Sequence, residues 1–190
     1  RLVDPPADLT TDIACFGTVS LALEPGASRY AALLKNLHRD GTFIALDPNI
    51  RPFYATKAHS DFLYSLLPSV DLLKLSDEEE EFLDQPEAPI KVITCGPDGL
   101  IVHFNGQTIE VTAPTIEVAD TIGAGDTVIG CLLAEIHRRT EGKNVRNKTM
   151  EFTGEDWAEI ASYAARAAAV TCTRVGANPP TRAEMEQLPE

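Results

Sequence analysis

Residues 120–126 read Asp-Thr-Ile-Gly-Ala-Gly-Asp and lie between an extended segment, Pro114–Ala119, and an amphipathic stretch that begins at Val128. Two glycines separated by one small residue let the backbone turn sharply, so that successive N–H groups converge at a helix start. We therefore expect a strand-to-helix turn whose amides can bind an anion. The carboxylate of Asp126 could then accept a proton from a hydroxyl held beside that anion. By itself, the same pattern also fits an ordinary helix cap.

On the N-terminal side of this turn, short apolar runs alternate with amphipathic segments. We expect buried strands at residues 13–16, 43–46, 70–73 and 90–93. Ser28 is positioned to cap a helix that ends at Gly41, and apolar residues at 62, 63, 66 and 67 indicate another helix. This alternation predicts an α/β fold with a mostly parallel sheet, helices on both faces, and ligands at the carboxyl ends of the strands.

The remaining chain predicts an antiparallel sheet edge and two more helices. A turn at 96–99 leads into an extended run at 100–104, an Asn105-Gly106 turn, and a second extended run that ends at Val111. Apolar residues between 128 and 136, and the alanine-rich segment 157–170, have helical spacing. The polar segment 141–154 is expected to be a surface loop.

Composition limits the class of protein. The chain has 190 residues, 44% of them hydrophobic, which suits one domain, expected over residues 1–190. A formal net charge of −13 opposes binding to nucleic acids and to anionic membranes. We leave a homodimer open.

The cysteines and histidines give no sign of a disulfide framework or a zinc site. The four cysteines are far apart, without C-x-x-C spacing, and the four histidines are scattered: Cys15, Cys95, Cys131 and Cys172; His38, His59, His103 and His137. We expect buried, reduced thiols and a cytoplasmic location. No apolar run approaches membrane-spanning length.

The whole of 120–126 resembles the D-T-x-G-A-G-D signature of the ribokinase/PfkB family of carbohydrate kinases. Residues 47–52, Asp-Pro-Asn-Ile-Arg-Pro, are similar to the D-P-N-x-R segment of its fructokinase-like members, and residues 16–25 also look most like fructokinases. The resemblance implies a ribokinase-like three-layer α/β/α fold. It covers the later part of a typical family member, so we expect the C-terminal portion of such a protein, without its lid region.

The resemblance assigns the chemistry of the turn and its surroundings. It implies that Asp126 is the catalytic base and that Gly123, Ala124 and Gly125 stabilise the phosphoryl oxygens. Asp120 and Ile122 would supply oxygens to a monovalent cation, K⁺ being the candidate.

Three further segments are similar to nucleotide-contacting parts of the family. Residues 74–79 look like the N-x-x-E region with serine in place of asparagine, 94–99 like a T-x-G-x-x-G turn, and 171–177 like a V-T-R-x-G-A ending. The implied nucleotide contacts, with the arginine of the 47–52 segment, are Arg51, Lys74, Ser76, Thr94, Gly96, Gly99, Thr173, Gly176 and Ala177. Glu79 would position Mg²⁺ through water.

Each of these segments also has a structural interpretation. Arg51 would serve equally well in an ion pair, residues 77–81 are an acidic run that suits a helix start, and 94–99 fits a plain tight turn.

The activity implied is Mg²⁺-dependent transfer of the ATP γ-phosphate to a sugar hydroxyl, with fructose favoured. Ribokinase, 2-keto-3-deoxygluconate kinase and nucleoside kinase activities are alternatives within the fold. A non-catalytic nucleotide-binding or regulatory homologue without a sugar site is the alternative from another class.

Overall fold

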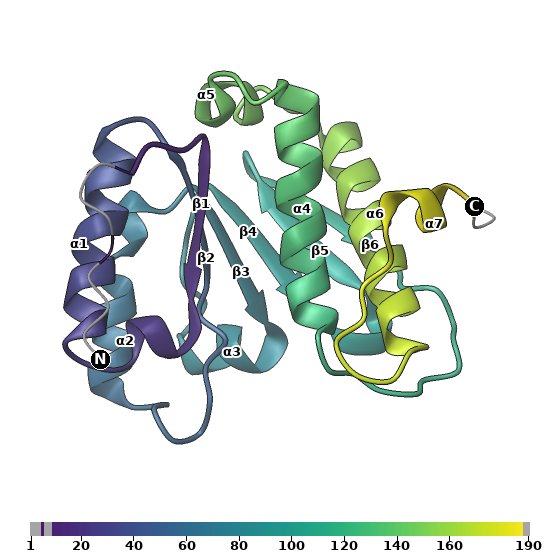
Figure 1. Cartoon of the computed structure of the whole chain (residues 1–190), viewed down its shortest axis with the longest axis horizontal. Coiled ribbons are helices and arrows are strands. Elements are labelled where there is room, and N and C mark those ends of the chain that lie inside the picture. The colour runs from purple at the N-terminus through teal and green to yellow at the C-terminus, as the bar shows by residue number, and fades with distance from the viewer. Residues whose placement is uncertain (1–4, 6–8, 188–190) are drawn as a thin grey trace.

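Six strands form one sheet in the order in which they occur in the chain (Figure 1). The computed structural model describes Pro5 and residues 9–187. The strands are β1 (Ile13–Gly17), β2 (Phe43–Asp47), β3 (Leu72–Ser76), β4 (Ile90–Thr94), β5 (Leu100–Phe104) and β6 (Gln107–Val111). Strands β1 to β4 are parallel, and β5 and β6 extend the sheet in antiparallel pairing. The predicted mostly parallel sheet with an antiparallel edge is confirmed.

Helices cover both faces of the sheet. The first three, α1 (Gly26–Arg39), α2 (Lys57–Tyr64) and α3 (Asp77–Phe82), lie in the connections between the parallel strands. The others follow the hairpin: α4 (Ala124–Thr140), α5 (Val145–Thr149), α6 (Gly154–Cys172) and α7 (Arg182–Glu186). Figure 1 shows α1 on the opposite side of the sheet from α4 and α6, as expected for three layers.

Two hydrophobic clusters join these layers, and β2 contributes to both. Phe43 and Ala45 belong to the cluster under α4 and α6, whereas Ile44 and Leu46 belong to the cluster under α1 and α2. Successive side chains of a strand point to opposite faces, so a strand covered on both sides reads as a continuous apolar run. This explains why β2 could be recognised from sequence.

The hairpin turn between β5 and β6 follows its sequence signature. Asn105 has φ 49° and Gly106 has φ 72°, and a two-residue turn of this kind needs positive φ at both central positions. The predicted turn is confirmed.

Two expectations about local structure are wrong. Helix α1 begins at Gly26, and the Ser28 hydroxyl, inside its first turn, donates to Glu24 Oε1 at 2.6 Å. The Glu24 carboxylate also accepts the N–H of Ser28, at 3.3 Å, so Glu24 does the capping that the sequence assigned to Ser28. Segment 141–154 contains helix α5, whose Val145 and Thr149 are buried one helical turn apart.

Helix α5 is attached to the amino-terminal end of the sheet by Arg146. Its Nε donates to Asp71 Oδ1 at 2.8 Å, and Nη1 donates to the carbonyl oxygen of His38 at 3.0 Å. The other oxygen of Asp71 accepts the N–H of Ile44 at 2.7 Å. The Arg146–Asp71 pair therefore connects α5, β2 and β3 on the side of the sheet away from residues 120–126.

The cysteines differ from expectation in their exposure. All four are free, as predicted, but Cys15 is exposed and Cys95, Cys131 and Cys172 are partly exposed, so the expectation of buried thiols is wrong. Cys15 lies on β1, whose outer edge has no partner strand in the described part of the chain, and Cys172 is the last residue of α6. No helix within residues 9–187 is long and apolar enough to cross a bilayer.

Candidate functional site

The turn at 120–126 lies at the carboxyl ends of the parallel strands and starts helix α4. Gly123 is the N-cap of α4 with φ 83°, a left-handed conformation that favours glycine. Among the described residues, the main-chain N–H groups of Gly125 and Asp126 have no hydrogen-bond acceptor. Asp126 lies in the first turn of α4 with an exposed side chain. Unpaired amides at the start of a 17-residue helix make an anion-binding position.

Asp120 connects this turn to the loop after α6. Its Oδ1 accepts the N–H of Ile122 at 3.0 Å, and its Oδ2 accepts the N–H of Gly176 at 2.9 Å. These two main-chain hydrogen bonds lower the pKa of the Asp120 carboxyl. A Cβ atom at Gly123 would lie 2.8 Å from the Cβ of Ala177, so glycine also allows the two loops to approach closely.

A cavity of about 460 Å³, here called the loop cavity, opens in front of this turn. It is lined by residues that the sequence analysis selected: Arg51, Lys74, Ser76, Glu79, Thr94, Ile122, Gly123, Gly125 and Asp126. They come from β3, α3 and the end of β4, from the segment that follows β2, and from the turn that starts α4. The two cationic side chains and the free amides make this cavity suitable for a polyanion.

Glu79 has a clear structural role in the wall of the loop cavity. One of its oxygens accepts the N–H of Ile50 at 2.5 Å and the other accepts the N–H of Ser76 at 2.8 Å. Ser76 in turn caps α3 by accepting the N–H of Glu79 at 3.2 Å. Serine and asparagine are both good N-caps, so the serine at this position keeps the corner intact.

A second cavity of about 470 Å³, the hairpin cavity, lies between the turn at 96–99, segment 113–118 and helix α6. Its lining is largely apolar and includes Pro97, Leu100, Val118, Val128 and Ala169. Such a slot suits a flat, weakly polar ring rather than a charged group.

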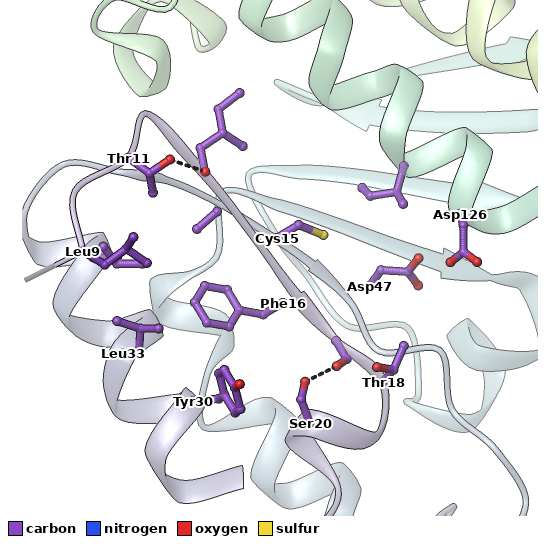
Figure 2. A pocket seen from close by; sticks show the side chains of 15 residues that line it. Leu9, Thr11, Cys15, Phe16, Thr18, Ser20, Tyr30, Leu33, Asp47 and Asp126 are labelled. Carbon is purple, nitrogen blue, oxygen red and sulfur yellow. Dashed lines mark hydrogen bonds between the residues drawn. The ribbon is translucent and has the colours of Figure 1, made fainter. Parts of the chain in front are cut away.

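A third cavity of about 560 Å³, the edge cavity, runs along the unpaired side of β1. Figure 2 shows the aromatic rings of Phe16 and Tyr30 at one end, and the carboxylates of Asp47 and Asp126 together at the other. An open cavity with apolar walls and two carboxylates can hold a polyhydroxylated molecule.

The three cavities form a series. Thr94, Thr121 and Gly125 line both the hairpin cavity and the loop cavity. Asp126 lines both the loop cavity and the edge cavity. One carboxylate therefore stands between a position suited to an anion and a position suited to an alcohol.

The structure places the other predicted residues around these cavities. Gly96, Gly99 and Ala124 line the hairpin cavity. Thr173, Gly176 and Ala177 line none of the three; they form the end of α6 and the loop that contacts Asp120 and Gly123. Sequence reasoning missed Asp47 as a site residue, although it begins the quoted 47–52 segment, and missed the α6 side of the hairpin cavity.

The side chains of this site suit a metal ion only if phosphate oxygens and water supply its other ligands. Among the described residues, no three His, Cys, Asp or Glu side chains cluster closely enough to hold a metal ion. Mg²⁺ needs only one or two carboxylates when phosphate oxygens and water complete its coordination. Glu78, Glu79 and Asp126 line the loop cavity, and this donor set fits a cation that enters with a phosphate chain.

Comparison with known proteins agrees with this architecture. The chain is 27% identical over 191 residues to a probable fructokinase-5 of Arabidopsis thaliana, a match that covers 91% of this chain and 56% of that protein. The chain thus spans little more than half the length of this curated relative.

Two solved structures show the fold. A fructokinase of Xylella fastidiosa with bound ATP superimposes with a TM-score of 0.78 at 20% identity, covering 87% of this chain and 56% of that chain. An aminoimidazole riboside kinase of Salmonella enterica superimposes with a TM-score of 0.74 at 17% identity, and the match covers 92% of this chain and 60% of that chain. The model of the pfkB family of carbohydrate kinases matches residues 11–184. The family model covers nearly the whole chain, and the D-T-x-G-A-G-D turn at residues 120–126 starts α4. This chain therefore belongs to the pfkB carbohydrate kinase family.

Proposed function

We propose that residues 1–190 act as a single ATP-binding and catalytic unit of a sugar kinase, which transfers the γ-phosphoryl group of ATP to a sugar hydroxyl. The observation that carries the proposal is the position of Asp126, which lines both the loop cavity and the edge cavity. A phosphoryl group in the first and an alcohol in the second would meet at this carboxylate.

The three cavities then have separate roles. The apolar hairpin cavity takes the nucleoside, the loop cavity takes the phosphates, and the edge cavity takes the sugar. Asp126 accepts the proton of the attacking sugar hydroxyl. The oxygen of that hydroxyl bonds to the γ-phosphorus of ATP, and the bond between the γ-phosphorus and the β-phosphate oxygen breaks. The amides of Gly125 and Asp126 donate to the phosphoryl oxygens on which charge develops.

Basic and acidic residues of the loop cavity organise the phosphates. Arg51 is exposed there and its guanidinium is free to turn towards them. Mg²⁺ would neutralise phosphate charge, with Glu79 holding it through water, since both oxygens of Glu79 already accept main-chain hydrogen bonds. K⁺ would bind the carbonyl and carboxylate oxygens near Asp120 and Ile122.

Fructose is the favoured acceptor because the curated relative is a probable fructokinase and because residues 47–52 are similar to a segment of fructokinase-like members. The riboside kinase of Salmonella enterica has a comparable TM-score, so ribose, 2-keto-3-deoxygluconate and nucleosides stay in the substrate panel.

The test measures ADP release by the protein that contains this chain, with Mg-ATP and fructose, ribose, 2-keto-3-deoxygluconate or a nucleoside. We expect sugar-dependent ADP release, fastest with fructose. ATP binding without turnover on any acceptor would instead support a nucleotide-binding regulatory homologue.

A further inference from the structure

A buried ion pair lies beneath the turn that begins α4. Lys74 Nζ on β3 is 3.2 Å from Asp47 Oδ1 and 3.3 Å from Asp47 Oδ2, at the end of β2. The two side chains are only 7% and 8% exposed. A lysine in this position interrupts an otherwise apolar strand, and a buried ammonium is stable there only because a carboxylate compensates its charge.

The ammonium of Lys74 lies close to Gly125 of the turn. A Cβ atom on Gly125 would lie 3.1 Å from Lys74 Nζ, so the absence of a side chain at 125 is what allows this approach. Lys74 also lines the loop cavity, whereas Asp47 lines the edge cavity beside Asp126. The pair thus spans the wall between the two cavities.

We propose that Asp47 is a positioning residue: it acts through Lys74, holding the ammonium under Gly125 so that it contacts the transferring phosphoryl group from the sheet side. This inference rests on the proposed kinase function. A lysine ammonium has three donors, and Asp47 engages it from one direction, which leaves donors for phosphoryl oxygens in the loop cavity. In a poorly hydrated position, such a charge stabilises the developing negative charge more strongly than it would in water.

The charges around Asp47 make this contact sensitive to pH. Lys74 of β3 faces it, together with Glu79 of α3, Asp126 of α4 and, as a thiol, Cys15 of β1. Burial raises the pKa of the Asp47 carboxyl to about 6, against the opposing effect of Lys74. Protonation of Asp47 below that pH would release the ammonium from its position.

The test compares Asp47→Asn, Lys74→Met and the double variant with the wild type. We expect Lys74→Met to lower kcat by about 100-fold, as loss of one transition-state donor does. Asp47→Asn should lower kcat by at least about tenfold, as loss of an orienting residue does. The pH profile of this variant should also lack the acidic limb near pH 6. In the Lys74→Met background, Asp47→Asn should have no further effect on kcat.

A matched control uses the neighbouring, partly buried pair of Lys91 and Glu80, whose Nζ and Oε1 atoms are 2.7 Å apart. Neither residue lines the three cavities, so Lys91→Met should reproduce any loss of stability without the loss of kcat. If Asp47→Asn alone unfolds the protein, the double variant, which removes both charges, still reports on Lys74.

A binding measurement separates this inference from the proposed function. By calorimetry, Lys74→Met should weaken binding of ATP at least about tenfold more than binding of ADP, whether or not any sugar is phosphorylated. Equal losses for ATP and ADP, or equal effects of Asp47→Asn on kcat in the presence and absence of Lys74, would overturn the positioning role.

Discussion

Replacing Gly125 with alanine should raise stability and lower activity at the same time. Gly125 is the second residue of α4, and in a helix alanine is more stable than glycine by about 0.5–1 kcal/mol. The new Cβ would lie 3.1 Å from Nζ and 4.0 Å from Cε of Lys74, so the flexible end of that side chain must retreat by a few tenths of an ångström. Little of the helix gain is lost in such a movement.

The functional cost is larger, because the displaced ammonium and the added methyl group both lie where phosphoryl oxygens are proposed to bind. We expect Gly125→Ala to raise Tm by about 1–4 °C and to lower kcat by about 10- to 100-fold. Thermal denaturation and ADP release measure the two effects. Gly130→Ala is the matched control, because a Cβ at that exposed position of α4 has no neighbour within 4 Å. A Gly125→Ala enzyme as active as Gly130→Ala would refute the reasoning.

Asp126→Asn should lower kcat by about 100- to 10,000-fold while the Kd for ATP, measured by calorimetry, changes by less than about threefold; retained turnover would remove the assigned base. Asp120 has a pKa below its ordinary 3.8, so its stabilising contribution is present above that pH and is lost as the pH falls through the lowered pKa. The Tm difference between wild type and Asp120→Asn should therefore be seen at pH 7 and shrink in acid, and a constant difference would contradict this assignment. Arg146→Met leaves the Asp71 carboxylate without its cation and should cost about 2–4 kcal/mol in urea denaturation, with kcat per folded molecule unchanged because the pair lies at the far end of the sheet.

The elements that could be predicted from sequence are those with one dominant physical cause. β2 is apolar throughout because it is covered on both faces, the hairpin has residues that tolerate positive φ, and α4 has a helical apolar stripe. Residues that line the loop cavity were found because segments 47–52, 74–79, 94–99 and 120–126 resemble motifs of the family.

The features that were missed depend on contacts between distant segments. Helix α5 is short and polar, and two buried side chains and the Arg146–Asp71 pair hold it in place. The sequence predicts this strand at residues 70–73, whereas β3 spans Leu72–Ser76 and includes Lys74. Asp47, 27 positions away in the chain, makes that lysine acceptable inside the sheet.

The outer edge of β1 has a consequence for handling the protein. Within residues 9–187 no strand pairs with that edge, and its sequence, Ile-Ala-Cys-Phe-Gly, has neither the charges nor the proline that usually keep exposed strands from joining. We therefore expect two molecules of this chain to align these edges at high concentration and to extend one sheet into the other. A sugar bound beside β1 would then compete with self-association, so ligand should keep the protein dispersed.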